Sequence, residues 1–415
     1  MRELKNSGVE WIGKIPSGWK VQRAKTYFKQ TNTRGNQNLV LLAATQKYGM
    51  FPQDMIEGVV KVKEDTDLQN FKTVHKGDFV ISLRSFQGGF EMSDYEGVCS
   101  PAYQTFHAVK DINNNYFRYF FKSSCFIDAI NSLTVGIREG KNIRYEDFAN
   151  SLIIFPPLAE QIAISSYLDD KCAKIDAIIA RHELIIAKLK EYRASLITET
   201  VTRGLNPDSE LKDSGVKLKY LCTCNDENLA ESTSDDYEFD YIDIGSVTQS
   251  EGVSMLQRMS FKNAPSRARR IVRNGDVIIS TVRTYLKAVA RINFSNVPQI
   301  ASTGFAVLRA KNINPNYLYY AVISDSFVSS VEAKSVGISY PAINSSELMN
   351  LKIPVPPLDQ QAAIASYLDD KCARIDDNIA KRELIIRKLT DYKKSLIYEA
   401  VTGKKEYNHH ENDME

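Results

Sequence analysis

Two short polar and aromatic runs follow apolar segments that resemble each other. The run Arg-Ser-Phe-Gln occupies positions 84–87, directly after the apolar segment 79–83, and Arg-Thr-Tyr-Leu-Lys occupies 283–287, after the segment 277–282. Arginine can donate two hydrogen bonds to guanine, and glutamine can bind adenine with the same two-point geometry. We therefore expect these runs to form loops suited to base edges. The predicted contact residues are Arg84, Ser85, Gln87, Arg283, Tyr285 and Lys287.

Other basic residues are candidates for phosphate contacts. One group lies at 138–144, and four arginines lie close together at 267–273. Clustered cationic side chains can neutralise a nucleic-acid backbone, although most surface arginines only solvate a face. The predicted phosphate-contact residues are Arg138, Lys141, Arg144, Arg269 and Arg270.

Motifs for catalysis or metal binding are missing from the sequence. It has no glycine-rich loop ending in Gly-Lys-Ser/Thr, and no Asn/Asp-Pro-Pro-aromatic tetrad. Asp208 and Glu210 resemble a nuclease motif, but they are only two positions apart in a probable linker. Cys222 and Cys224 lack the second pair that a zinc site needs. We expect no catalytic residue, no metal and no cofactor in this chain.

Bulk properties indicate an ordinary globular protein. The 415 residues are enough for two or three domains, with 43% hydrophobic and 25% charged residues. The net charge of +2 and the pI near 8.0 are low for a DNA-binding protein, so basic residues must cluster or partners must help. The start has no secretory signal, no apolar run approaches membrane-spanning length, and six cysteines form no evident disulfide framework. These features favour a cytoplasmic protein with reduced thiols.

The candidate loops need a scaffold, and the sequence predicts it twice. Segments 79–83 and 277–282 follow a Gly-Asp pair and are typical of buried strands. Segments 116–121 and 317–322 follow Asn-rich turns and favour short helices. Each loop is therefore expected in a mixed domain of strands and helices.

A strong internal repeat separates these domains. Positions 153–202 and 353–402 match without a gap at an offset of 200, and 32 of the 50 residues are identical. The remaining sequence repeats only faintly, as in Gly136-Ile137 and Gly337-Ile338. The organisation is variable domain, repeated segment, variable domain, repeated segment, which indicates a duplication.

Each repeated segment is expected to be one long helix. Positions 158–201 contain neither proline nor glycine, and their apolar residues alternate by threes and fours, the pattern of a coiled coil. Two like helices in one chain most simply pair antiparallel, and about 40 residues would span about 60 Å. Such a pair could hold two domains about two turns of DNA apart. The predicted packing residues are Leu168, Ile175, Ile179, Ile186, Leu189, Leu368, Ile375, Ile379, Ile386 and Leu389.

The sequence resembles the specificity subunits of Type I restriction-modification enzymes. The resemblance rests on the entry Pro-Pro-Leu-Ala-Glu-Gln at 156–161, on Tyr-Leu-Asp at 167–169, and on the exit Val-Thr-Arg-Gly at 201–204. The opening Trp-Ile-Gly…Pro…Trp at 11–19 is similarly typical. The second copy lacks this Trp-containing opening, has Asp-Gln-Gln at 359–361 and has Thr-Gly-Lys at 402–404. The first difference leaves open where the second recognition domain begins.

The resemblance implies a fold and a set of partners. The α+β fold would comprise two mixed target recognition domains separated by two long antiparallel coiled-coil helices, related by a pseudo-twofold repeat. Each domain would read half of a bipartite, asymmetric site in double-stranded DNA. The helices would set the spacing and dock two methyltransferase subunits that bind S-adenosylmethionine, joined by restriction subunits that use ATP and Mg²⁺. The expected parts are recognition domains at 1–151 and 205–350, spacer helices at 152–204 and 351–404, and a tail at 405–415.

Two other functions stay open from the residues alone. A coiled-coil scaffold that binds only proteins would explain the helices, but it needs no Arg-aromatic loops at matching places in both domains. An autonomous methyltransferase or nuclease would need a motif that the sequence does not offer.

Overall fold

The chain is described here from a computed structural model. The described residues are 2–36, 38–46, 48–56, 68–83, 88–132, 143–206, 215–248, 252–293, 295–337 and 339–405. The fold comprises two compact units. The first unit contains Met1–His182 and Leu384–Glu415, and the second contains Glu183–Glu383. Each unit therefore holds one variable domain together with half of each repeated helix.

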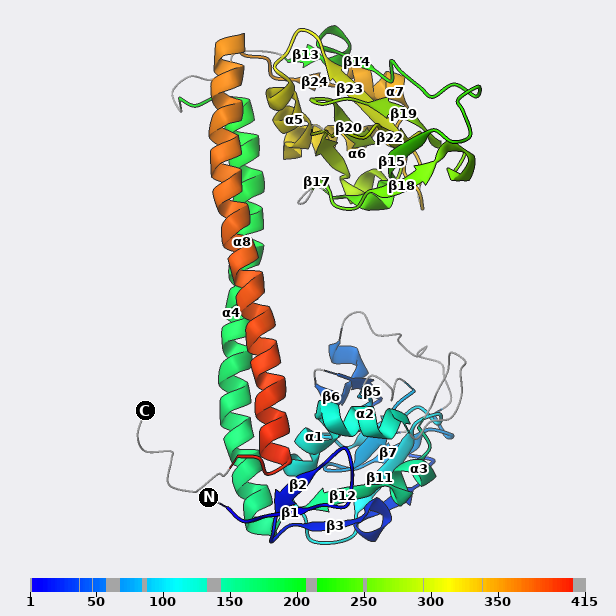
Figure 1. The fold of residues 1–415 in the computed structure, drawn as a ribbon, viewed down its shortest axis with the longest axis vertical. Helices are drawn as coiled ribbons and strands as arrows, with labels where there is room; N and C mark the ends of the chain where they lie inside the picture. The colour runs from blue at the N-terminus through cyan, green and yellow to red at the C-terminus, as the bar shows by residue number, and fades with distance from the viewer. Residues whose placement is uncertain are drawn as a thin grey trace. The chain divides into compact units, whose positions relative to one another are not determined.

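The repeated segments form the two long helices α4 (Leu158–Arg203) and α8 (Leu358–Val401), shown in Figure 1. In the first unit Lys393 of α8 lies 2.6 Å from the Asp176 carboxylate of α4. In the second unit Arg193 of α4 lies 3.1 Å from Asp376 of α8. Residues 176 and 376, like 193 and 393, are equivalent at the repeat offset. The two ion pairs are thus the same contact made twice, and within each unit the helices run antiparallel, as predicted.

The apolar seam residues are buried to different extents along the helices. Leu168 and Ile175 join the core of the first unit, where Ile179 and Leu389 pack against it. Leu368 belongs to the core of the second unit, and Ile375 and Ile379 are also buried. Toward the middle of the helices the predicted residues are half-buried: Ile186, Leu189 and Ile386.

The first domain is built around an antiparallel four-stranded sheet of order β4-β11-β8-β9. Helices α1 and α2 pack on it over a core rich in phenylalanine, in which Phe28, Phe79 and Phe106 lie edge to face or stacked. The elements are β1 (Leu4–Asn6), β2 (Lys14–Pro16), β3 (Lys20–Arg23), β4 (Phe28–Thr31), β5 (Leu42–Thr45), β6 (Gly49–Pro52), β7 (Lys72–Val74), β8 (Phe79–Ile81), β9 (Phe90–Met92), β10 (Gly97–Cys99), β11 (Gln104–Ala108), α1 (Asn114–Lys122), α2 (Ser124–Ser132), α3 (Tyr145–Asn150) and β12 (Leu152–Phe155), with short 3-10 helices at Ala24–Thr26 and Gln53–Met55.

The second domain repeats this sheet as β14-β23-β20-β21 and adds a second sheet of order β18-β15-β22-β19. Only the β15–β22 pair among the strands of that second sheet is parallel. The elements are β13 (Val216–Lys217), β14 (Cys222–Cys224), β15 (Glu238–Ile242), β16 (Val247–Thr248), β17 (Gly252–Val253), β18 (Gln257–Ser260), β19 (Ala268–Val272), β20 (Val277–Ser280), β21 (Val289–Arg291), β22 (Gln299–Ser302), β23 (Phe305–Ala310), α5 (Pro315–Ile323), α6 (Asp325–Lys334), α7 (Ser345–Asn350) and β24 (Lys352–Ile353), with 3-10 helices at Leu218–Tyr220, Ile244–Ser246, Phe261–Asn263 and Thr284–Leu286.

The Gly-Asp pair builds the same turn in both domains. Gly77 has φ +90° and Gly275 has φ +85°, a conformation that glycine adopts without strain. The Asp78 carboxylate accepts the backbone N–H of His75 at 2.9 Å, and Asp276 accepts that of Arg273 at 2.8 Å. The predicted strands β8 and β20, which follow these turns, and the predicted helices α1 and α5 are confirmed.

Each domain is fastened to its long helix by a buried glutamine. Gln161 accepts the Asn113 N–H at 2.8 Å and donates to the Pro156 carbonyl at 2.8 Å. Gln361 makes the same pair of bonds with Asn314, at 2.8 Å, and Pro356, at 2.7 Å. Because Asn113 and Asn314 cap α1 and α5, the glutamine joins the start of a domain helix to the start of a long helix.

Replacing the second glutamine should destabilise the second unit. In Gln361→Ala the N–H of half-buried Asn314 and the buried Pro356 carbonyl both lose their partner, which costs about 2–4 kcal/mol in unfolding free energy. Differential scanning calorimetry would measure the loss. The neighbouring Gln360→Ala, at an exposed position, should change stability by less than about 0.5 kcal/mol. Equal effects of the two substitutions would contradict a fastening role.

Candidate nucleic-acid interface

The loop after β20 has a strained backbone. Arg283 and Lys287 both have φ +50°, and between them Thr284–Leu286 forms one 3-10 turn. Side chains other than glycine rarely adopt this left-handed conformation, and such strain is typical of functional sites. Together with Asn225, these are the non-glycine residues with positive φ in the described part of the chain.

A neighbouring segment supports this loop. The Thr284 N–H donates to the Pro341 carbonyl at 3.3 Å, and the Thr284 hydroxyl bonds that of Ser335 at 2.9 Å. The Arg283 guanidinium lies over the Tyr340 ring, 5.2 Å from its centroid. Buried Thr284 thus anchors the loop, while the neighbouring side chains of Arg283 and Tyr285 are exposed.

The exposed side chains here form one surface with a cation, two phenol rings and aliphatic groups. Tyr285 is 52% exposed and Tyr340 is 67% exposed, although both are large and partly apolar. Such rings can stack on bases, and an arginine held over a ring is already oriented to donate hydrogen bonds. We call this the reading surface of the second domain; it consists of Arg283, Tyr285, Leu286, Val336 and Tyr340.

Two of the five residues of this surface were predicted from the sequence, and their contact with DNA stays a prediction. Arg283 and Tyr285 were predicted, and Lys287 lies half-buried at the end of the loop, 4.0 Å from Glu332. Leu286, Val336 and Tyr340 were not among the predicted residues. The faint repeat at Gly337 was the signal that could have drawn attention to them.

The arginines at 267–273 are engaged within the domain. Arg269 lies over the Phe261 ring at 4.9 Å, and half-buried Arg270 donates to the Asn228 side chain at 2.8 Å. Arg267 and Arg273 form ion pairs with Asp243 and Glu227, respectively. The hydrogen bond to Asn228 makes Arg270 a weaker candidate for DNA contact than Arg283. The ring contact of Arg269 is of the same kind as that of Arg283 and does not separate the two residues.

Of the predicted residues in the first domain, Arg144 lies in the described part of the chain. Arg144 is exposed at the start of α3, where its guanidinium pairs with Asp147 at 3.0 Å. This contact raises the pKa of Arg144, first through the hydrogen bond and then through the opposite charge. The other predicted residues, Arg84, Ser85, Gln87, Arg138 and Lys141, lie outside the described residues.

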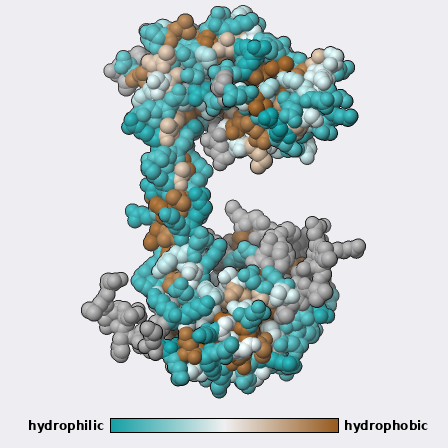
Figure 2. Space-filling view, in the orientation of Figure 1, coloured by the Kyte–Doolittle hydropathy of each residue, from teal (hydrophilic) through white to brown (hydrophobic). Residues whose placement is uncertain are grey.

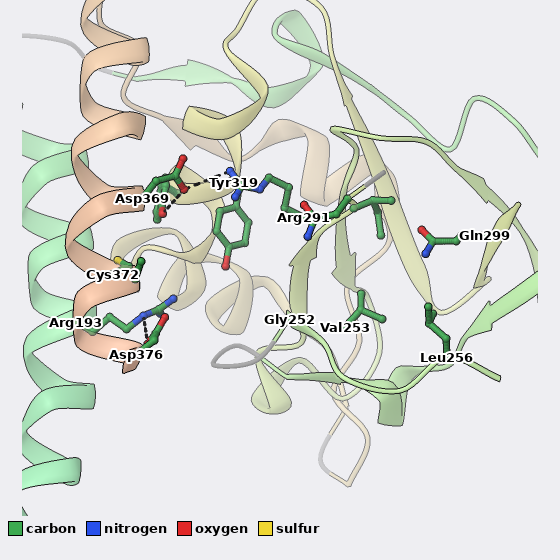
Figure 3. Close-up of a pocket in the computed structure, with 14 residues that line it drawn as sticks. Arg193, Gly252, Val253, Leu256, Arg291, Gln299, Tyr319, Asp369, Cys372 and Asp376 are labelled. Carbon is green, nitrogen blue, oxygen red and sulfur yellow. Dashed lines mark hydrogen bonds and ion pairs between the residues drawn. The ribbon is translucent and has the colours of Figure 1, made fainter. Parts of the chain in front are cut away.

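A second polar contact joins each domain to the helices, and sequence reasoning missed it. The Asp169 carboxylate of α4 accepts the hydroxyl of Tyr119 at 2.7 Å. Asp369 of α8 accepts the hydroxyl of Tyr320 at 2.8 Å and lies 3.4 Å from Arg291 (Figure 3). Burial, and then the hydrogen bond to the carboxylate, raise the pKa of both tyrosines. The aspartate of the repeated Tyr-Leu-Asp sequence therefore makes the same contact in both units.

A buried ion pair lies at the edge of the first candidate loop. Glu91 on β9 is 2% exposed and pairs with Lys122, whose ammonium also donates to the Gly88 carbonyl at 2.8 Å. Burial raises the pKa of Glu91 to about 7, and Lys122 only partly opposes this. Lys122 thus holds the backbone directly after the segment 84–87.

Neither a metal centre nor a membrane span emerges from the described part of the chain. Its residues contain no group of three or more His, Cys, Asp or Glu side chains placed to hold a metal ion. None of its helices has an apolar stretch long enough to cross a bilayer. All six cysteines are unpaired.

Comparison with known proteins identifies the family. The family model "Type I restriction modification DNA specificity domain" matches residues 19–189 and 216–385, so the chain belongs to this family and carries its domain twice.

Relatives agree in sequence and in fold. The MjaVIII specificity subunit of Methanocaldococcus jannaschii is 23% identical, covering 62% of this chain and 63% of that protein. The EcoBI specificity subunit of Escherichia coli is 22% identical, covering 69% and 65%. The aligned parts thus span less than two thirds of both relatives. A solved chain from work on complex assembly and conformational transition of the type I R-M system superposes with a TM-score of 0.69 at 17% identity, covering 94% of this chain and 99% of that one. The overall fold is therefore shared.

The buried glutamate predicts a pH-dependent stability of the first unit. Because the folded-state pKa of Glu91 lies above the ordinary 4.5, its contribution to stability is complete below about pH 4.5 and is lost as pH rises through 7. Glu91→Gln should remove this loss, on the order of 3 kcal/mol between pH 5 and pH 8.

Tryptophan fluorescence can follow this unfolding, since Trp11 and Trp19 are the only tryptophans and both lie in the first unit. The control Glu10→Gln, at an exposed position, should keep the pH dependence of the parent chain. An unchanged pH dependence in Glu91→Gln would show that Glu91 is not the titrating group.

Proposed function

We propose that this chain is the DNA-reading subunit of a Type I restriction-modification complex. Each recognition domain would read one half of a bipartite site in double-stranded DNA, and the paired helices would set the spacing between the halves. The observation that carries the proposal is the reading surface of the second domain, where Arg283 and Tyr285 project from a strained loop that Thr284 anchors. A scaffold that binds only proteins gives no reason for this strain or this chemistry.

The two domains support an asymmetric target. Their sheets share one topology and are joined to α4 and α8 by the same glutamine and aspartate contacts. Their loops differ, since Arg-Ser-Phe-Gln in one domain stands where Arg-Thr-Tyr-Leu stands in the other. Two domains that are attached to the helices in the same way but carry different loops are what recognition of two different half-sites requires.

The helices offer surface for partner subunits. Apolar side chains remain exposed on α4 and α8, including two at equivalent positions of both helices, and apolar residues are visible on the helices in Figure 2. Exposed apolar surface of this kind favours protein contact. The residues are Ile178, Leu184, Tyr192, Leu384, Ile385 and Tyr392. We assign this surface to two methyltransferase subunits.

The chemistry belongs to the partners in this proposal. The methyltransferase subunits would bind S-adenosylmethionine, and restriction subunits would use ATP and Mg²⁺. This chain would supply recognition without a catalytic residue or cofactor of its own, and it would act in the cytoplasm, where its DNA target lies.

Exchange of one domain tests the proposal as a whole. Replacing residues 204–350 by the corresponding segment of another specificity subunit should change one half of the recognised sequence and leave the other half intact, because base contacts are local to each domain. Sequencing of methylated positions in DNA modified by the assembled complex gives both halves. A change in both halves, or in neither, would count against the proposal.

A single side chain tests the reading surface. Arg283→Ala should relax the choice of base at one position of the second half-site, with a loss of about 1–3 kcal/mol in discrimination. Lys311→Ala removes the same charge from an exposed turn of the same domain and should leave base choice unchanged. Relaxed base choice in both variants, or in neither, would remove Arg283 from the site.

A further inference from the structure

The first domain contains a pocket rich in hydrogen-bond acceptors, with a volume of about 470 Å³. It lies where β4, β7, β8 and β11 meet the start of α1. The lining residues that matter here are Thr33, Thr73, His75, Asp78, His107 and Asn114.

The register of the strands identifies the same place in the second domain. Phe106 pairs with Phe79 in the first sheet, and Leu308 pairs with Val277 in the second. His107 follows Phe106 and Arg309 follows Leu308, so His107 and Arg309 occupy equivalent positions. Asp78 precedes Phe79 and Asp276 precedes Val277, so the two aspartates are also equivalent. A backbone hydrogen bond found in both domains adds two more equivalent pairs. The Thr73 N–H donates to the Thr33 carbonyl, and the Ile271 N–H donates to the Glu227 carbonyl.

An arginine occupies this place in the second domain. The Arg309 guanidinium donates to both Asp276 carboxylate oxygens, at 3.0 and 2.8 Å, and to Glu227 at 3.0 Å. This planar, bidentate pairing is the arrangement that guanidinium and carboxylate groups prefer.

In the first domain the aspartate remains as Asp78 but the arginine does not, and Thr33 stands in the place of Glu227. Asp78 is 7% exposed, and its carboxylate accepts the N–H of His75. The Thr73 hydroxyl oxygen, in a residue that is 3% exposed, has no hydrogen-bond partner, and neither does the buried Asn114 Oδ1. The Asn114 amide nitrogen donates to the Gly77 carbonyl at 3.1 Å, which leaves the oxygen as the unpaired end. Buried acceptors without donors are costly and call for a donor-rich group.

We propose that this pocket binds a guanidinium group through Asp78, Thr73 and Asn114, in the manner of the Arg309–Asp276 pair. A guanidinium offers five N–H donors and no acceptor, which matches the unpaired atoms. Among the other charged groups, Lys76 is exposed at the rim and His75 lies 3.2 Å from Glu96. Burial raises the pKa of Asp78, with only His75 and His107 opposing it, so the carboxylate lacks the cation that Asp276 has.

Histidine signals provide a direct test in the intact chain. Two of the five histidines, His75 and His107, line the pocket, whereas His182 lies on α4. In NMR spectra of the ¹³C-histidine-labelled protein, guanidinium chloride should shift the signals of His75 and His107 saturably and leave His182 unchanged. Sodium chloride and tetramethylammonium chloride at the same concentrations should not do so. Shifts that these salts reproduce would overturn the proposal.

Substitutions tie the response to the pocket. Asp78→Asn should weaken guanidinium binding at least about tenfold, because it removes a charged acceptor. His107→Arg should supply the group from within the chain and abolish the saturable shift of His75. If Asp78→Asn fails to fold, the His107→Arg variant alone tests the proposal. A saturable shift of the His75 signal that persists in His107→Arg would overturn the proposal.

The second domain supplies the matched control. Arg309→Ala opens the equivalent space, and the lost thermal stability should be regained with guanidinium chloride at low millimolar concentration and not with tetramethylammonium chloride. Two further probes distinguish the source of the group. Tighter binding of agmatine than of a short arginine peptide indicates a free small cation, and the reverse order indicates an arginine side chain of another protein.

Discussion

The whole arrangement depends on two polar contacts that each unit makes between a long helix and a domain helix. A buried glutamine of the long helix binds the N-cap residue of the domain helix, and an aspartate of the long helix binds a tyrosine farther along the domain helix. In the first unit the glutamine and the aspartate are Gln161 and Asp169, and in the second they are Gln361 and Asp369. Apolar packing alone would let a domain slide or turn on the helix, since it has no direction. Hydrogen bonds that must be satisfied in a buried place fix the orientation. The same two contacts, used twice, attach two different domains in one way.

The ion pairs between the helices follow the same rule. Asp176 with Lys393 and Arg193 with Asp376 occupy equivalent positions of the repeat. A duplicated helix that pairs antiparallel with its copy meets its own residues in reverse order, so one favourable charge pair appears at two places. One pairing of the repeated sequence therefore serves both units.

The sequence predicted the repeat, the long helices, their antiparallel pairing and the central strands, because all of these depend on local periodicity and on one strong duplication. It placed Arg283 and Tyr285 on a loop, since they directly follow a recognisable strand. It could not place Tyr340 beside them, because contacts between segments about 55 positions apart leave no local pattern. It also suggested a phosphate contact for Arg270, which stays a prediction, although the half-buried guanidinium already donates to Asn228. Local composition shows that arginines cluster, but not which of them already have an internal partner.

The most direct test of the account is to select duplexes from a fully randomised library with the intact chain and its methyltransferase partner. Two unlike domains, each attached to the helices in the same way, predict an enriched motif with two different specified blocks, separated by a gap of fixed length and free sequence. A single uninterrupted block, or enrichment of no motif at all, would contradict the claim that this chain carries two readers on a shared pair of helices.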